Sequence, residues 1–171
     1  IYEREVENFL DFIRFIHKIG VDAVIMQDLG MMDLVRKKFP NLEIHASTQM
    51  HIHNFEGAKF LQELGIKRVV LARETPINII KELTKLGIEI EVFVHGALCF
   101  ACSGNCLMSY SIGQRSGNRG KCAQPCRKTY SLYENNNLLI SKKAVLSMKD
   151  LCTIDNIQEL IVNNKNIFDM N

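Results

Sequence analysis

The chain of 171 residues has no tryptophan and only three prolines, and no apolar run approaches the roughly 18 residues that a membrane span needs. It contains no glycine-rich phosphate turn after a strand and no His-Glu-x-x-His sequence, which argues against a dinucleotide-binding fold and a metalloprotease of that type. Residues 1–5 form neither a basic leader nor an apolar signal core. We therefore expect a cytoplasmic protein without a membrane partner. Because residue 1 is not methionine, we also expect a segment of a longer protein.

The chain does contain a repeated strand–helix pattern. With 47% hydrophobic and 23% charged residues, it has enough apolar material for the core of one globular domain. Apolar residues at helical spacing predict helices, and short continuous apolar runs predict strands buried on both faces. The predicted helices cover 6–16, 31–39, 55–64 and 77–86, with Asn54 and Thr75 as N-caps and Pro76 in a first turn, and the predicted strands cover 23–26, 44–46, 69–72 and 90–94.

The strands recur about every two dozen residues, which predicts parallel strands joined by helical crossovers. An open doubly wound sheet and a (β/α)₈ barrel both fit this pattern, and the missing glycine-rich turn favours the barrel. Four strand–helix units cannot close eight strands. We therefore expect an α/β fold in which residues 1–95 form part of a TIM-type barrel. Residues 96–171 are expected to form a Cys-rich loop, a small β-hairpin and the following helix of the same domain.

The hairpin is predicted from residues 130–133 and 138–140, which flank Glu134-Asn-Asn-Asn137. Apolar positions at 154, 157, 160 and 161 predict a helix with Cys152 at its start. The hairpin would return the chain so that Cys152 reaches the other thiols.

In parallel α/β folds, the loops leaving the carboxyl ends of the strands build the active site. Each predicted strand ends in polar residues, which we expect to form one ring: Gln27, Asp28, Thr48, Gln49, Arg73, Glu74 and His95. Of these, the candidate catalytic residues are Gln49, Arg73, Glu74 and His95. Arg73 can clamp the carboxylate of a small anionic co-substrate, and Glu74 and His95 can transfer protons. His51 and His53 alternate along an extended segment, so we expect surface or N-cap histidines rather than ligands of one metal.

No acidic residue lies between Glu91 and Glu134, where five of the six cysteines and five cations are found. Cationic surroundings favour thiolate and attract anions such as RNA or a carboxylate. Three of the cations are expected to position nucleic acid or close over the anion: Arg115, Arg119 and Arg127. The alternative is a basic surface loop with incidental cysteines.

The cysteines allow three kinds of chemistry. A zinc ribbon would use Cys99-x₂-Cys102 with Cys122-x₃-Cys126. An iron–sulfur cluster tolerates wider spacing and would take Cys99, Cys106, Cys122 and Cys152 if the loop folds back over the barrel mouth. A redox disulfide at Cys99-x₂-Cys102 is less well supported, because such a pair usually opens a helix in a thioredoxin-like setting that is absent here.

Two segments, EVFVHGALC at 91–99 and SGNCLMS at 103–109, resemble the signature of peptidase family U32, the collagenase-like proteases. Further segments resemble the family in family order: HASTQ at 45–49, RVVLARE at 68–74, GQRSGNRG at 113–120, CAQPCR at 122–127 and SMKDLC at 147–152. The resemblance implies a TIM-type barrel. In several branches of the family it also implies a 4Fe-4S cluster that serves hydroxylation of tRNA uridine, linked to prephenate, or of ribosomal RNA cytidine or a ubiquinone precursor.

The resemblance places the cluster ligands at Cys99, Cys106, Cys122 and Cys152, with Cys126 as the alternative to Cys122 and with Cys102 peculiar to this chain. We expect an iron–sulfur protein that hydroxylates a tRNA uridine, with RNA and a small anion such as prephenate as partners, and a partner subunit of the same family. A peptidase is the first alternative, with Ser109 or Cys99 as nucleophile and His95 as base, although no third orienting residue is evident. A zinc-braced RNA-binding module is the second.

Overall fold

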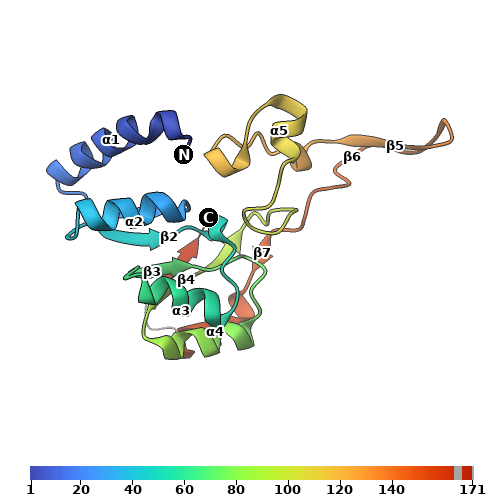
Figure 1. The fold of residues 1–171 in the computed structure, drawn as a ribbon. Coiled ribbons are helices and arrows are strands. Elements are labelled where there is room, and N and C mark those ends of the chain that lie inside the picture. The colour runs from blue at the N-terminus through green and yellow to red at the C-terminus, as the bar shows by residue number, and fades with distance from the viewer. Residues whose placement is uncertain (164–166, 171) are drawn as a thin grey trace.

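The computed structural model describes residues 1–163 and 167–170, and four helices alternate with four strands in its first part (Figure 1). The helices are α1 (Val6–Lys18), α2 (Leu29–Lys38), α3 (Phe55–Glu63) and α4 (Ile77–Leu83), and the strands are β1 (Ala23–Met26), β2 (Glu43–Ala46), β3 (Arg68–Val70) and β4 (Glu89–Gly96). Each lies where the periodicity predicts it, with small differences at the ends. Within the described residues, no helix has the length and apolar character needed to cross a bilayer.

The strands form one sheet in which β1, β2, β3 and β4 are parallel neighbours in that order. Two later strands extend it: β7 (Leu151–Cys152) pairs antiparallel with the end of β4, and β8 (Ile167–Met170) pairs parallel with β4. Over the described residues the sheet is open. The mixed α/β fold with parallel strands is therefore confirmed, and closure into a barrel stays a prediction.

The two faces of the sheet differ in character. The core joins inward-facing helix and strand residues, among them Val35, Leu61, Val69, Leu83 and Ile90. Along β4 buried and partly buried residues alternate, which places Glu89 and Glu91 on the opposite face. There Arg68 forms ion pairs with Glu89 at 2.9 Å and with Glu91 at 3.3 Å. On β1, Ile25 is 63% exposed, so the prediction that this strand is buried on both faces is wrong for the described part of the chain.

Side-chain capping fixes the starts of helices α2 and α3. The Asn54 side chain accepts a hydrogen bond from the Gly57 amide at 2.8 Å, which confirms this residue as the N-cap of α3. Asp28 caps α2 in the same way. The prediction for α4 is wrong, because its N-cap is Pro76 and the Thr75 hydroxyl instead donates backward to the Ala72 carbonyl at 2.7 Å.

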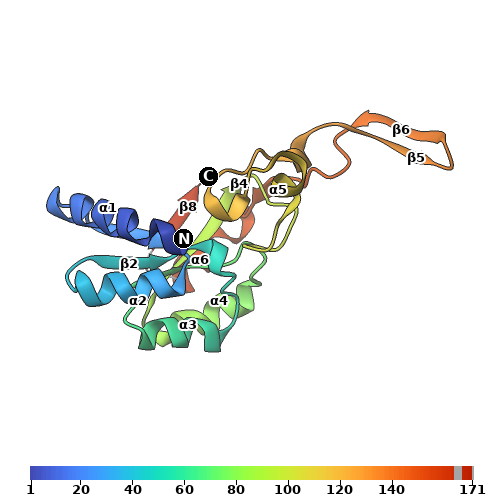
Figure 2. The same cartoon turned by 45° about the horizontal axis from the view of Figure 1, so that its top comes forward.

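The predicted hairpin consists of β5 (Tyr130–Glu134) and β6 (Asn137–Lys143). Asn135 and Asn136 join the strands with φ of 43° and 67°, the left-handed conformations that a type I′ turn requires and asparagine tolerates. Figures 1 and 2 show the hairpin projecting from the body of the protein. Helix α5 (Met108–Gly113) and the 3₁₀ turn η5 (Pro125–Arg127) precede it in the chain.

The prediction that Cys152 starts a helix is wrong. This residue lies in β7, opposite His95 of β4. The next residue fixes this arrangement, since the Thr153 amide and hydroxyl both donate to the Val94 carbonyl, at 3.0 and 2.8 Å. Helix α6 (Ile157–Asn163) begins only after a further 3₁₀ turn. Cys152 is therefore held at the carboxyl end of β4, the end from which the Cys-rich loop leaves.

Candidate functional site

The largest concentration of thiols in the structure lines one cavity of about 210 Å³. Five of the six cysteines contribute to its wall: Cys99, Cys102, Cys106, Cys122 and Cys126. Gln49 and Arg73 reach it from the ends of the strands, and Arg127 reaches it from η5. None of the lining residues is Asp or Glu. The cavity therefore combines thiols with guanidinium groups and no carboxylate, a setting that favours thiolate and anions.

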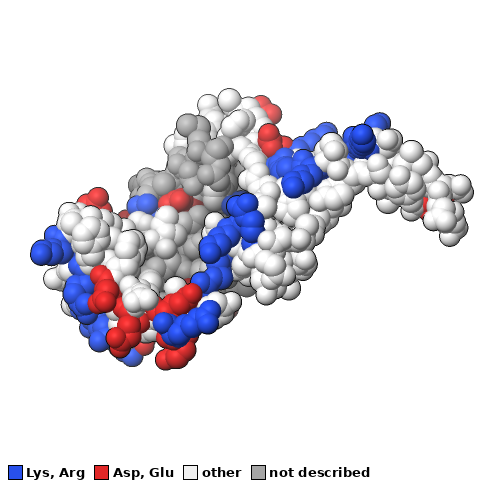
Figure 3. Space-filling view, turned by 90° about the horizontal axis from the view of Figure 1, so that it is seen from above, with Lys and Arg blue, Asp and Glu red and all other residues white. Residues whose placement is uncertain are grey.

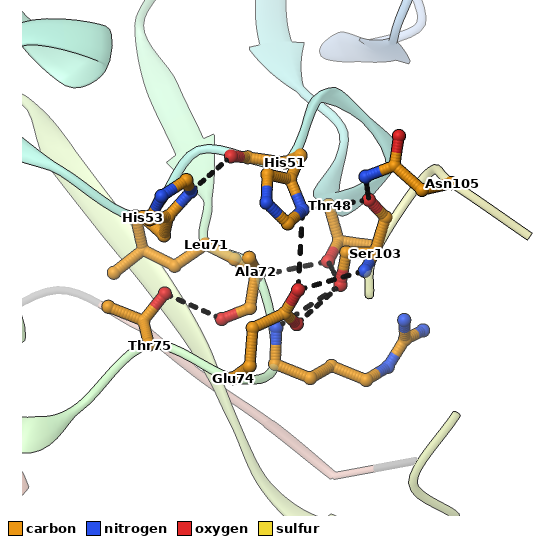
Figure 4. A network of polar contacts seen from close by, with 10 residues as sticks. Thr48, His51, His53, Leu71, Ala72, Glu74, Thr75, Ser103 and Asn105 are labelled. Carbon is orange, nitrogen blue, oxygen red and sulfur yellow. Dashed lines mark hydrogen bonds and ion pairs between the residues drawn. The ribbon is translucent and has the colours of Figure 1, made fainter. Parts of the chain in front are cut away.

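The turn between Cys102 and Cys106 is fastened to the sheet by one carboxylate, that of Glu74 (Figure 4). Glu74 accepts hydrogen bonds from the Ser103 amide at 2.9 Å and from the Ser103 hydroxyl at 3.0 Å. The Ser103 hydroxyl in turn accepts a hydrogen bond from the Arg73 amide at 3.3 Å. Ser103 is 2% exposed, so these partners replace water around a fully buried hydroxyl.

His51 contributes to the same network. Its Nδ1 lies 3.0 Å from the Ser103 carbonyl and 3.3 Å from a Glu74 carboxylate oxygen. Both neighbours are acceptors, so we assign a proton to Nδ1. The prediction of a surface or N-cap histidine holds for His53, which is exposed, but is wrong for His51. Residue 51 is not extended, because it follows the 3₁₀ turn at 48–50 in a left-handed conformation with φ of 59°.

Gly104 allows this turn to lie directly against the end of β2. Its φ is +78°, and a Cβ atom placed there would lie 2.0 Å from the Gln49 carbonyl oxygen. No side chain larger than hydrogen fits such a contact without moving the backbone. The Ser103-Gly104-Asn105 turn is therefore the point at which the Cys-rich loop docks on the strand ends.

Glu74 is held as a carboxylate. Burial raises the pKa of Glu74, but the hydrogen bonds from Ser103, together with nearby His51, outweigh it and bring the pKa below its usual value. A carboxyl group with a lowered pKa is a poor proton donor at neutral pH. The contacts of Glu74 are those of a positioning residue that anchors the loop, whereas its predicted partner in proton transfer, His95, is exposed at the end of β4.

Arg73 is a member of the predicted ring that has an unsatisfied donor for a ligand. Its guanidinium lies over the Phe93 ring, 4.6 Å from the ring centroid. Its Nε atom is buried and has no hydrogen-bond partner among the described residues. A buried donor without a partner is costly, and a carboxylate would satisfy it with strong, charge-assisted hydrogen bonds. Arg73 also lines the thiol cavity, so such an anion would lie beside the cysteines.

Arg127, predicted to bind substrate, links η5 to two other segments of this chain. Its guanidinium donates to the Leu98 carbonyl, the Ser147 hydroxyl and the Met148 carbonyl, each at 3.0 Å. Leu98 directly precedes Cys99, and Met148 lies four residues before Cys152. Arg127 therefore holds together the segments that carry the first and last of the predicted ligands.

The other two predicted substrate-binding arginines also make internal contacts. Arg119 forms a bidentate ion pair with Glu5, in which its two terminal nitrogens lie 2.7 and 3.2 Å from the carboxylate oxygens. Its guanidinium also lies over the Tyr2 ring. The hydrogen bond from Arg119 is the main cause that lowers the pKa of Glu5 to about 2. Arg115 donates to the Lys121 carbonyl at 3.0 Å. These guanidinium groups fix the loop in place.

The cysteines that line the cavity are the ligands that an iron–sulfur cluster or a zinc ion requires. Their sulfur atoms, however, are not close enough for three of them to share a metal ion. Three of the four predicted iron–sulfur ligands line it, namely Cys99, Cys106 and Cys122, whereas Cys152 is not among the lining residues. All four cysteines of the alternative zinc ribbon line it as well. Within the described residues, no three His, Cys, Asp or Glu side chains are close enough to hold a metal ion.

Residues 1–168 match the family described as Peptidase family U32. The chain belongs to this family. The resemblance drawn from its motifs is thereby confirmed. The 23S rRNA 5-hydroxycytidine C2501 synthase of Escherichia coli (strain K12) is 40% identical over 163 residues, which are 94% of this chain and 24% of that relative. The tRNA hydroxylation protein P of the same strain is 40% identical over 135 residues, 78% of this chain and 30% of the relative.

Peptidase names also occur among U32 relatives. The "Uncharacterized protease MJ0090" of Methanocaldococcus jannaschii is 39% identical over 172 residues, 94% of this chain and 42% of the relative. The solved structure of the U32 peptidase Mk0906 superposes with a TM-score of 0.53 at 12% identity, over 98% of this chain and 61% of that one, which shows a shared fold. The chain spans from 24% to 42% of the length of these curated relatives.

Ser103 and Ser109 of this U32 chain are not arranged as peptidase nucleophiles. Ser109, one predicted nucleophile, is 4% exposed, and its hydroxyl accepts a hydrogen bond from the Ala123 amide at 2.9 Å. Ser103 lies near a histidine and a glutamate, but its hydroxyl donates to the Glu74 carboxylate rather than to the His51 ring. An activated serine needs the imidazole as its direct base. Both serines therefore act as anchors of the Cys-rich loop.

Proposed function

We propose that this chain is part of an RNA hydroxylation protein that acts on a tRNA uridine. The observation that carries the proposal is the cavity lined by five cysteines and no carboxylate at the strand ends. Two relatives of this chain at 40% identity are named as an rRNA hydroxycytidine synthase and a tRNA hydroxylation protein, which supports RNA as the substrate. The burial and hydrogen bonding of Ser109 argue against this residue as the nucleophile of the alternative, a peptidase, and the other predicted nucleophile, Cys99, is assigned to the cluster in this proposal.

We propose that a 4Fe-4S cluster binds at the cavity through Cys99, Cys106, Cys122 and Cys152, with Cys126 as the alternative third ligand. When bound, the cluster supplies one-electron chemistry or braces the loop. The contacts of Arg127 support the participation of Cys152, because this side chain ties residues 147 and 148 to Leu98. The cationic cavity would offset the negative charge of the thiolates.

The chain's own residues would bind and orient the reactants. Arg73 binds a small carboxylate such as prephenate, because its buried Nε lacks a partner and its guanidinium can grip a carboxylate in two places. Gln49 lines the same cavity and orients the anion or the target base. His95, exposed at the end of β4, remains the candidate for proton transfer. A partner subunit of the same family stays a prediction.

We also propose that the open sheet is one part of a TIM-type barrel in the longer protein. Four consecutive parallel strand–helix units support this, because they can be continued by further units on the same pattern. The polar sheet face with Arg68 and Glu91 would then line the interior of the barrel. A cytoplasmic location stays a prediction.

The proposal is tested by nucleoside analysis in cells. The gene for the full-length protein is deleted and then restored as wild type, Cys106→Ala or Cys102→Ala, and hydroxylated uridine is measured in purified tRNA by mass spectrometry. We expect the modification to disappear on deletion, to return with wild type and Cys102→Ala, and to remain absent with Cys106→Ala. Unchanged tRNA and rRNA nucleosides in the deletion strain would refute RNA hydroxylation.

A further inference from the structure

The charges of this chain are segregated along the sequence. Residues 96–149 contain eight Lys and Arg and a single acidic residue, Glu134, although the whole chain has 21 basic and 19 acidic residues. Most of the excess positive charge therefore lies in the Cys-rich loop and the hairpin. Figure 3 shows blue side chains along the projecting arm and little red on it. A surface of this kind attracts polyanions.

Within this segment the arginines and the lysines differ in their partners. Arg115, Arg119 and Arg127 are each bonded within the chain, as described above. Lys128, Lys142 and Lys143 are exposed, and in the described part of the structure no carboxylate pairs with their ammonium groups. On the helices, by contrast, Lys37 pairs with Asp33 and Lys81 with Glu159. Among the described residues of this segment, the cations whose charged groups have no hydrogen-bond or ion-pair partner are therefore lysines.

These three lysines lie together at the root of the hairpin. Lys128 is the C-cap of η5 and lies two residues before the start of β5, whereas Lys142 and Lys143 end β6. Lys143 pairs with Tyr130 across the two strands. The Tyr130 hydroxyl donates to the Pro125 carbonyl at 2.8 Å, and Pro125 is part of the cavity wall. The backbone of the hairpin root is thus tied through Tyr130 to the wall of the thiol cavity.

We propose that the hairpin root, defined by Lys128, Lys142 and Lys143, binds the phosphates of the RNA whose target base enters the thiol cavity. This inference rests on the proposed function. Ammonium groups neutralise phosphates without reading sequence, and their binding weakens as salt rises. Tyr133, further along β5, is 61% exposed and offers a ring on which an unpaired base stacks.

A protein is the competing occupant, because the tip of the hairpin exposes apolar side chains. Leu132, Leu138 and Leu139 are 47%, 52% and 55% exposed. Charge favours RNA at the root, where three lysines lie without acidic neighbours in the sequence from 120 to 133 and from 135 to 149. The leucines lie toward the turn, farther from the cavity, so the two surfaces can be tested separately.

The test measures binding of unmodified tRNA to the full-length protein by fluorescence anisotropy over a series of salt concentrations. One variant carries Lys128→Gln, Lys142→Gln and Lys143→Gln, and a matched control carries Lys18→Gln, Lys38→Gln and Lys59→Gln on the exposed surfaces of helices α1 to α3. We expect the hairpin variant to bind at least tenfold more weakly, with the slope of log K against log salt reduced by about 2, as for three lost phosphate contacts. The control should match wild type.

The outcomes separate the inference from the proposed function. If wild type binds and hydroxylates tRNA but the hairpin variant keeps the wild-type affinity and slope, the inference is wrong and the function stands. If the deletion strain retains all hydroxylated nucleosides, the function is wrong. A third variant, Leu132→Ser with Leu138→Ser, is expected to bind tRNA normally. If the leucine variant abolishes hydroxylation, whereas the lysine variant still binds tRNA like wild type, the hairpin docks a protein. The inference is then overturned.

Discussion

Glu74 and Ser103 are joined by two hydrogen bonds, one from the serine amide at 2.9 Å and one from its hydroxyl at 3.0 Å. They lie 29 positions apart in the chain. One belongs to the loop that follows β3, and the other belongs to the turn between the cysteines. The pair therefore couples the strand ends of the sheet to the cavity wall, and the position of the thiols depends on it.

We expect Glu74→Gln to lower the free energy of unfolding by about 1–3 kcal/mol, because a hydrogen bond to a charged acceptor contributes more than one to an amide. Ser103→Ala should cost a similar amount. The double variant should cost clearly less than the sum of the two, because both substitutions act on one shared hydrogen bond, that from the Ser103 hydroxyl to the Glu74 carboxylate. Urea denaturation followed by circular dichroism measures all three. Strict additivity would show that the two residues do not act together.

Gly104→Ala is expected to displace the turn. The added Cβ would lie 2.0 Å from the Gln49 carbonyl oxygen, in a backbone conformation that alanine rarely adopts. We predict a loss of more than about 2 kcal/mol in unfolding free energy, and faster alkylation of the cavity thiols. Gly113→Ala is the matched control, because no atom lies within 4 Å of its added Cβ. Equal stability and equal thiol reactivity of the two variants would contradict the docking described here.

Arg127→Lys tests whether this side chain gathers the segments that carry Cys99 and Cys152. A single ammonium cannot replace a planar guanidinium that donates to Leu98, Ser147 and Met148 at once. We expect amides in 147–152 to exchange with deuterium several-fold faster than in wild type. Arg36→Lys is the control, since its pair with Asp33 lies on the surface of α2. Unchanged exchange in the Arg127 variant would show that other contacts hold these segments.

The Glu5–Arg119 pair predicts a dependence of stability on pH. The hydrogen bond from Arg119 lowers the pKa of Glu5 from 4.5 to about 2. A carboxylate with a lowered pKa stabilises the fold above its unfolded pKa and loses this contribution as pH falls toward the folded pKa. The difference in urea midpoint between wild type and Glu5→Gln should therefore be constant above about pH 5 and shrink as pH falls to about 2. A difference that does not change with pH would contradict the pairing.

Sequence periodicity was sufficient to predict the parallel sheet and its helices. The apolar patterns of residues 1–95 determine which faces of the helices and strands are buried. The N-cap at Asn54 is also predictable, because its side chain bonds an amide only three residues away. For Thr75 the prediction is wrong because a threonine hydroxyl can either accept from an amide of the following helical turn, as an N-cap does, or donate to a preceding carbonyl, and in the structure it donates to the Ala72 carbonyl. Contacts within a few residues are thus predictable in type but not always in partner.

The site was harder to predict because it depends on long-range contacts. The cationic, Cys-rich character of the loop was evident in the sequence, but the burial of Ser103 against Glu74 was not. The one available sequence signal was the Ser-Gly-Asn turn, since glycine between polar residues marks a tight backbone approach. Arg119 was expected to bind substrate because it is charged, and its partner Glu5, 114 positions away, could not be foreseen from the sequence.

The most direct test of the central claim is analysis of iron, acid-labile sulfide and zinc in the full-length protein purified without oxygen, as wild type, Cys106→Ala and Cys102→Ala. The account predicts about four iron and four sulfide per wild-type chain, as a 4Fe-4S cluster contains, with the same content in Cys102→Ala and almost none in Cys106→Ala. A colourless wild-type protein with one zinc and no sulfide, or full iron retention in Cys106→Ala, would contradict it.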